Sequence, residues 1–152
     1  MSVRIVPISL GMNDCYVIQE RGTIMVDGGV PRSARAFTKA LEKLSIEPME
    51  IKLIIITHGH FDHFGSANTI REMTDAKVAL HQTDQQRLEK EKMIWPPGTT
   101  PWGRISRGLL KPMLSLLRPE LPQVDILLRD EGLSLEAYGI SGRIIHTPGH
   151  SP

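Results

Sequence analysis

Three histidines and one aspartate lie within six residues of the chain, in the segment Thr57-His58-Gly59-His60-Phe61-Asp62-His63, directly after an apolar run at 51–56. A β-branched apolar run of this length is typical of a buried strand. In α/β proteins the chemically active side chains gather beyond the C-terminal ends of such strands. Imidazole nitrogens and carboxylate oxygens are ligands that zinc and similar divalent ions prefer. The segment therefore predicts a metal site at the end of a strand in an α/β fold.

The spacing of the four side chains indicates two adjacent metal positions. His58 and His60 alternate by two residues, so their rings can point toward one ion, whereas Asp62 and His63 come from the following turn and can reach a second ion. The alternative is a polar loop that is rich in histidine by coincidence. Four side chains of ligand type in this register favour the metal site.

Length and composition describe one ordinary domain of 152 residues, 40% of them hydrophobic and 23% charged, with a net charge of +1. The near-neutral charge argues against binding to nucleic acid or to an acidic membrane surface. The first residues contain no long apolar segment, so we expect a cytoplasmic protein. The single cysteine, Cys15, excludes an internal disulfide, and its apolar neighbours predict a buried strand residue.

Apolar periodicity and turn residues predict an order of three strands, a helix, a strand, and then alternating helices and strands. Ser33 is expected to cap the first helix, which runs to about residue 44. The predicted strands lie at 3–10, 15–19, 23–26, 51–56, 77–80, 126–128, 133–138 and 143–146, and the other predicted helices at 65–75 and 83–92.

Three motifs in this order resemble the metallo-β-lactamase superfamily of hydrolases. They are the segment 57–63, the upstream Val26-Asp27-Gly28-Gly29, and the downstream Thr147-Pro148-Gly149-His150-Ser151-Pro152. The resemblance implies a four-layer αββα sandwich, with residues 1–152 as the N-terminal part of one such domain. It also implies a first metal position held by His58, His60 and His150, and a second to which Asp62 and His63 contribute.

By the same resemblance, Asp62 is a catalytic residue as well as a ligand, while Asp27 and Thr57 hold the ligand loop by hydrogen bonds. Without the resemblance, the position of Asp27 before two glycines is also compatible with a residue that only forms a turn. The family has seven ligands, of which we expect five in this chain, so the second ion should be weakly held. Much of the second sheet should also be missing, and pairing with another copy of the chain is one way to cover the exposed sheet.

We expect residues 93–122 to form a helical insertion. Its composition is apolar and basic, and it resembles a lid over the substrate. A peripheral helix pair or an oligomer contact is the alternative. Two further histidines, His81 and His146, stand at predicted strand ends, and we expect neither to bind metal directly.

The resemblance implies a hydrolase in which a zinc-bound hydroxide attacks the carbonyl carbon of a thioester, lactone or related ester of small-molecule size. Retention of Asp62 and His63 is similar to the glyoxalase II and lactonase branches. Up to two zinc ions are expected, with iron or manganese as alternatives, and a nuclease is disfavoured by the weak overall charge. Two other functions stay open: a non-catalytic half-domain or assembly module with an incomplete metal site, and a single-iron persulfide dioxygenase.

Overall fold

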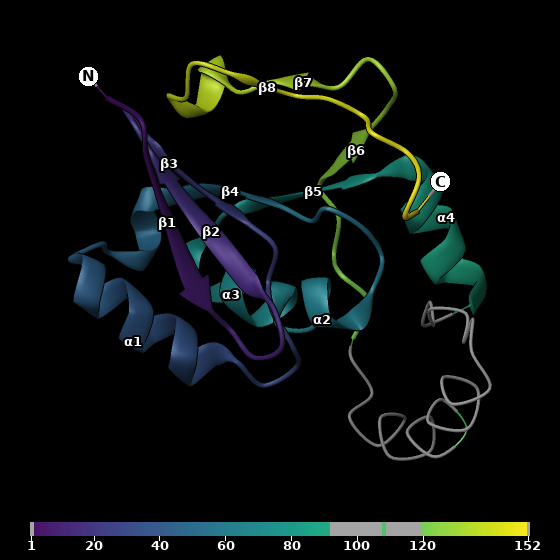
Figure 1. Ribbon diagram of the computed structural model, residues 1–152, viewed down its shortest axis with the longest axis horizontal. Helices are drawn as coiled ribbons and strands as arrows, with labels where there is room; N and C mark the ends of the chain where they lie inside the picture. Colours follow the sequence, from purple (N-terminus) through teal and green to yellow (C-terminus); the bar gives the residue numbers. More distant parts are fainter. Residues whose placement is uncertain (1, 92–107, 109–119, 152) are drawn as a thin grey trace.

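The computed structural model describes residues 2–91, 108 and 120–151 of the chain. Its centre is a six-stranded sheet in which the order of the strands in space follows their order in the chain (Figure 1). The second strand runs antiparallel to both the first and the third, whereas the third to the sixth strands run parallel to one another. The strands are β1 (Arg4–Ser9), β2 (Asp14–Gln19), β3 (Thr23–Val26), β4 (Ile51–Ile55), β5 (Lys77–His81) and β6 (Ile126–Leu128).

Helices cover one face of this sheet, and a small second sheet lies over the other face (Figure 1). The α-helices are α1 (Ala34–Leu44), α2 (Phe61–Phe64), α3 (Ala67–Thr74) and α4 (Gln82–Glu91). The second sheet pairs β7 (Leu133–Ser134) with β8 (Arg143–Ile144), and short 3-10 turns lie at η1 (Pro48–Glu50) and η2 (Glu136–Tyr138). None of the helices in the described ranges is long and apolar enough to cross a membrane.

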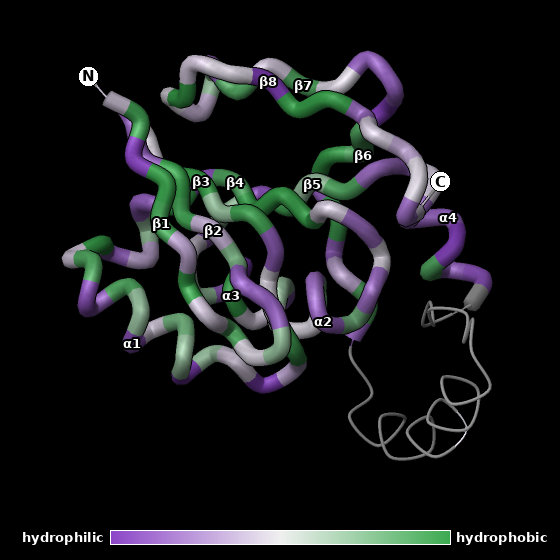
Figure 2. Tube along the Cα trace, in the orientation of Figure 1, coloured by the Kyte–Doolittle hydropathy of each residue, from purple (hydrophilic) through white to green (hydrophobic). Residues whose placement is uncertain are grey.

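Two apolar clusters hold these layers together, one on each face of the six-stranded sheet. On the helical face, Phe37 and Leu41 of α1 and Ile70 of α3 are fully buried in one cluster. On the opposite face, Leu135 and Ile140 pack in a second cluster, which includes inward-facing residues of β3, β4, β5 and β6. The central strands are hydrophobic along most of their length (Figure 2), as expected for parallel strands that are covered on both faces.

The parallel strands β3 to β6 position the candidate site, because their C-terminal ends meet at one edge of the sheet. Asp27 follows β3, Thr57 follows β4, His81 ends β5, and Asp130 comes just after β6. The polar residues after each strand are therefore brought to the same end of the sheet although the first and the last of them lie about a hundred residues apart in the chain.

The predicted α/β class is confirmed. Two detailed predictions are wrong, and a third falls mostly on residues that the structure does not describe. The strand expected at 133–138 ends at Ser134, because the chain turns into η2 and then into Gly139, whose φ is 76°. Ser33 stands at the start of α1, but its hydroxyl donates to the carbonyl oxygens of Leu10 and Val30 and does not cap the helix. The insertion at 93–122 lies outside the described residues except for 108 and 120–122.

Candidate metal centre

The segment 57–63 leaves β4 as an extended loop and then turns into the short helix α2. His60 is extended, with φ of −87° and ψ of 141°, and the backbone N–H of His63 donates to its carbonyl oxygen. The two halves of the motif thus have different backbone conformations. His58 and His60 stand on the loop, whereas Asp62 and His63 stand on the helix.

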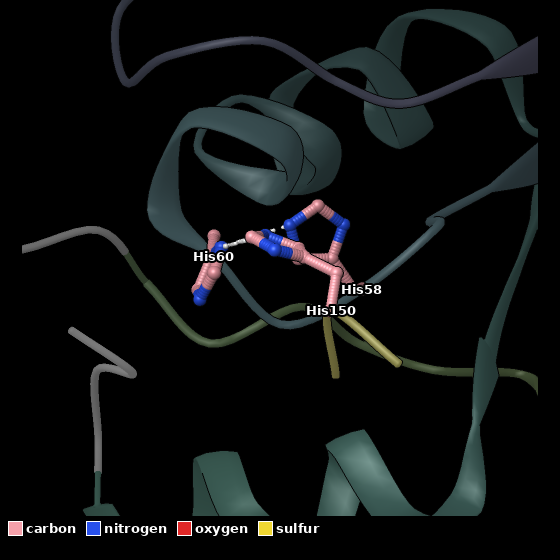
Figure 3. A group of neighbouring side chains, drawn as sticks. All are labelled: His58, His60 and His150. Carbon is pink, nitrogen blue, oxygen red and sulfur yellow. Dashed lines mark hydrogen bonds between the residues drawn. The ribbon is translucent and has the colours of Figure 1, made fainter. Parts of the chain in front are cut away.

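His58, His60 and His150 bring three ring nitrogens together although His150 is 90 residues away from His60 in the chain (Figure 3). Nε2 of His58 lies 2.8 Å from Nδ1 of His60, and Nε2 of His150 lies 3.3 Å from the same atom. Two nitrogens bonded to one tetrahedral zinc ion at about 2.0–2.1 Å would stand roughly 3.3 Å apart. The 3.3 Å pair matches this value and the 2.8 Å pair is shorter, so the three rings fit a single ion once those of His58 and His60 separate slightly.

The orientation of the three rings also fits a bound ion. The planes of the three ring pairs are inclined at 78°, 84° and 85° to one another. The lone pair of an imidazole nitrogen lies in the plane of its ring, so three planes that cross at steep angles allow three lone pairs to meet at one point.

Two of these rings, those of His58 and His60, are held in the neutral form that a metal requires. Burial, with smaller effects from the neighbouring imidazoles His63 and His60, lowers the pKa of His58 to about 4. Burial, together with the neighbouring His150, also lowers the pKa of His60. At neutral pH both rings are therefore uncharged, with a lone pair available.

Asp27 anchors the ligand loop from the end of β3. It is 4% exposed and has a φ of 63°, a left-handed conformation that a non-glycine residue seldom adopts. Its Oδ1 accepts hydrogen bonds from the backbone N–H of Thr57 at 2.8 Å and from the Thr57 hydroxyl at 2.9 Å. Because that hydroxyl proton is donated to Asp27, the Thr57 oxygen accepts from Nδ1 of His58 at 3.0 Å. The chain of hydrogen bonds leaves Nε2 of His58 as the nitrogen with the lone pair.

Asp62 and His63 form a separate pair of donors next to the three histidines. Nδ1 of His63 donates to Oδ2 of Asp27 at 2.8 Å, which turns Nε2 toward Asp62, whose Oδ2 lies 3.6 Å away. The pKa of His63 is raised overall. Burial alone would lower it, but the hydrogen bond to Asp27 and the negative charges of Asp27 and Asp62 together have the larger effect. The ring of His63 lies 4.1 Å from that of His58, between centroids.

A second group, His81, Asp130 and His146, lies at the same edge of the sheet. Oδ1 of Asp130 is 3.3 Å from Nε2 of His81 and 3.0 Å from Nδ1 of His146. The two rings are stacked at 4.0 Å with only 15° between their planes. Lone pairs that lie in nearly parallel planes do not converge on one point, so this arrangement suits a carboxylate shared by two imidazoles better than a chelated ion.

Sequence reasoning missed one buried carboxylate at this site. Asp84, in the first turn of α4, is 1% exposed and accepts hydrogen bonds from Gly59 and Ser151. A signal for its burial was present in the sequence, because Asp84 and the buried Leu88 are four residues apart and so share one face of the helix.

A family model described as the metallo-beta-lactamase superfamily matches residues 8–152. Among curated proteins, the chain is 30% identical over 137 residues to the probable metallo-hydrolase YflN of Bacillus subtilis, covering 85% of this chain and 48% of that protein. It is 24% identical over 159 aligned positions to hydroxyacylglutathione hydrolase GloC of Haemophilus influenzae, covering 100% of this chain and 63% of that protein. The chain thus spans about half to two thirds of the length of these relatives.

Among solved structures, the chain resembles BJP-1, a subclass B3 metallo-beta-lactamase of Bradyrhizobium japonicum. The TM-score is 0.60 and the sequence identity is 23%, over 96% of this chain and 48% of that enzyme. At this identity the likeness concerns the fold, which agrees with the layered sheet described above.

Proposed function

Because the chain belongs to the metallo-beta-lactamase superfamily, we propose that it forms the metal-binding part of a hydrolase that cleaves the acyl C–O bond of a small ester or the acyl C–S bond of a thioester. The observation that carries the proposal is the convergence of three imidazole nitrogens from His58, His60 and His150, at distances of 2.8 and 3.3 Å. Three protein ligands are the number that a catalytic zinc site uses, since the fourth position stays open for water or substrate.

Each residue has a distinct part in the proposed reaction. Nε2 of His58, Nδ1 of His60 and Nε2 of His150 would hold the ion, and Asp27 with Thr57 would fix the His58 ring so that Nε2 faces it. A bound divalent ion supplies a water-derived nucleophile at neutral pH and polarises the carbonyl group of the substrate. The proposed reaction therefore requires no nucleophile from a protein side chain.

We propose zinc as the ion, with iron or manganese as alternatives, because the donor set is rich in imidazole and lacks thiolate. At the second position, Asp62 and His63 are the donors found among the described residues, and His63 already gives one nitrogen to Asp27. We therefore expect this pair to bind an ion more weakly than the three histidines do, and Asp62 to act there as a ligand close to the reacting groups.

The thioester class of substrate is supported by the similarity to hydroxyacylglutathione hydrolase GloC, whose name specifies an acylated glutathione. A lactone or another activated ester has the same reacting carbonyl and belongs to the same proposal. A cytoplasmic location and pairing of the chain with a second copy stay predictions, for which fractionation and size in solution are the measurements.

Metal analysis combined with a hydrolysis screen tests the proposal. The purified chain, loaded with zinc and then desalted, should retain about one ion per chain, and His60→Ala should lose it. The matched control is His146→Ala, which removes a histidine outside the three and should keep the ion. Turnover of a thioester, lactone or ester by the loaded chain, absent from His60→Ala, would support a hydrolase.

Other outcomes favour the alternative functions. Stoichiometric metal without hydrolysis of any substrate would favour a binding or assembly module. Preference for one iron, with oxygen consumption in the presence of a persulfide, would favour a dioxygenase of persulfides. Retention of the ion by His60→Ala would contradict the assignment of the site.

A further inference from the structure

Asp84 lies between the two segments that carry the candidate ligands. α4 runs beside the C-terminal end of the described chain (Figure 1), and Asp84 stands in its first turn. Oδ1 of Asp84 accepts a hydrogen bond from the backbone N–H of Gly59 at 3.1 Å, and its Oδ2 accepts one from the hydroxyl of Ser151 at 3.0 Å. One side chain therefore contacts both segments.

The two partners of Asp84 are the immediate neighbours of the three histidines. Gly59 lies between His58 and His60, and Ser151 follows His150. A carboxylate group is rigid and its two oxygens are a fixed distance apart. The spacing between the loop after β4 and the segment around His150 is therefore set by a group on a third element, α4.

The burial of this carboxylate points to a positive charge nearby. Asp84 is 1% exposed, and a buried ionised carboxylate is costly unless it is paired with positive charge or strongly hydrogen-bonded. In the described part of the chain, neither lysine nor arginine forms an ion pair with it. The N-terminal end of α4 favours a negative charge but only partly offsets this cost.

We propose that Asp84 is a positioning residue for the metal centre: it holds the loop of His58 and His60 against the segment of His150 at the spacing of one ion, and its charge favours the bound cation. This inference rests on the proposed function, because it assumes that the three histidines bind an ion. It adds a residue outside the ligand motifs and gives Ser151 a role next to the ligand His150.

Three substitutions separate the hydrogen bonds of Asp84 from its charge. Asp84→Ala removes both. Asp84→Asn removes the charge but keeps both contacts, since its carbonyl oxygen can accept from Gly59 while its amide donates to the Ser151 oxygen. Ser151→Ala removes the contact with the segment of His150 and leaves the charge. Glu89→Gln is the matched control, because Glu89 is an exposed carboxylate on the same helix that accepts a hydrogen bond from Nε2 of the half-buried Gln85.

The measurement is the dissociation constant for zinc, determined on the full chain by competition with a chromophoric chelator, with the visible spectrum of the cobalt form as a second readout. Substitutions of residues that orient metal ligands typically weaken metal affinity about 10–100-fold. We expect such a loss for Asp84→Ala, with an altered cobalt spectrum, and smaller losses for Asp84→Asn and Ser151→Ala. Glu89→Gln should leave both readouts unchanged.

Thermal unfolding of the metal-free variants distinguishes positioning from a purely structural role. A structural role would lower the melting temperature and leave the zinc affinity of the folded molecules unchanged. Should Asp84→Ala fail to fold, Asp84→Asn and Ser151→Ala carry the test. Wild-type zinc affinity in both of these variants would overturn the inference, whereas absence of zinc binding by the wild-type chain would overturn the proposed function itself.

Discussion

Asp27 and His63 are joined by a hydrogen bond of 2.8 Å between Oδ2 of the aspartate and Nδ1 of the histidine. The bond connects the end of β3 to α2, and the backbone reinforces it because the N–H of Gly28 donates to the carbonyl oxygen of His63. The same carboxylate binds Thr57, so Asp27 fixes both halves of the motif 57–63. The candidate metal centre therefore depends on a buried residue that lies outside that motif.

Replacement of Asp27 should destabilise the chain strongly. Asp27→Ala leaves the backbone N–H of Thr57 and the ring Nδ1–H of His63 without their acceptor, and we expect a loss of about 2–4 kcal/mol in the free energy of unfolding. Asp27→Asn tolerates the left-handed backbone and keeps the contacts with Thr57, so its loss should be smaller. Asp14→Ala, at an exposed aspartate on β2, is the control and should change stability by less than about 0.5 kcal/mol. Urea unfolding curves measure all three, and equal stability of Asp27→Ala and wild type would contradict this account.

The stability of the metal-free chain should be greatest near pH 6.5, because two histidines shift in opposite directions. The pKa of His63 is raised in the folded state, so its contribution is complete below its unfolded pKa and is lost as the pH rises through the folded value. The pKa of His58 is lowered to about 4, so the unfolded chain takes up the proton first and stability falls as the pH drops from about 6.5 toward 4.

Unfolding curves in the presence of a chelator, collected from pH 4 to 9, test this dependence. We expect His58→Gln to reduce the acid loss by about 1–2 kcal/mol, less than the shift alone implies because His58 is only half-buried. Asp27→Asn should flatten the decline on the alkaline side, since it removes the partner that raises the pKa of His63. A profile of wild type that rises steadily through pH 8 would be incompatible with the raised pKa.

Gly28→Ala should separate the loop after β3 from α3. A Cβ atom at Gly28 would lie 2.9 Å from the backbone nitrogen and 3.0 Å from the Cα of Ala67, the first residue of α3. Backbone cannot give way as a flexible side chain does, so we expect a loss of about 1–3 kcal/mol in unfolding free energy. Gly142→Ala is the control, because a Cβ there meets no atom within 4 Å. Similar melting temperatures for the two variants would show that the contact with α3 is unimportant.

Cys15 should be unreactive in the native chain. It is fully buried in β2, and burial, with a smaller effect from the charge of Asp27, raises the pKa of its thiol to about 12. The thiolate is the reactive species, so an aromatic disulfide reagent at pH 8 should label less than about a tenth of the chains. The same reagent in denaturant should release one equivalent, since the sequence contains one cysteine. Full labelling of the folded chain at the rate seen for the denatured chain would show that β2 opens readily.

The parts of the fold that rest on periodicity were predictable from the sequence. β4 is an almost continuous apolar run, and α1 buries Phe37 and Leu41 from a stripe at helical spacing. Short elements near the second sheet were less predictable. The run from Leu133 to Tyr138 alternates apolar and polar residues as a strand does, but η2 interrupts it, because the hydrogen bond from the N–H of Tyr138 to the carbonyl of Leu135 closes a turn.

In the candidate site, local spacing indicated His58 and His60, and only the resemblance to a family indicated His150. Tertiary contacts of single residues could not be read from the sequence. Nothing local shows that the carboxylate of Asp84 reaches Gly59 and Ser151, 25 and 67 residues away. Nor does spacing distinguish the steeply crossed rings of His58, His60 and His150 from the stacked rings of His81 and His146.

The separation of 90 residues between His60 and His150 has a thermodynamic consequence. An ion bound by both residues would be a cross-link that closes a loop of about three fifths of the chain, and such a closure lowers the entropy of the unfolded ensemble. A disulfide that closes a loop of comparable length is worth roughly 4–5 kcal/mol in the chain-entropy description. Metal uptake would then also be the step that fastens the second sheet and the segment after β8 to the first sheet, so that a chelator would loosen the architecture as well as empty the site.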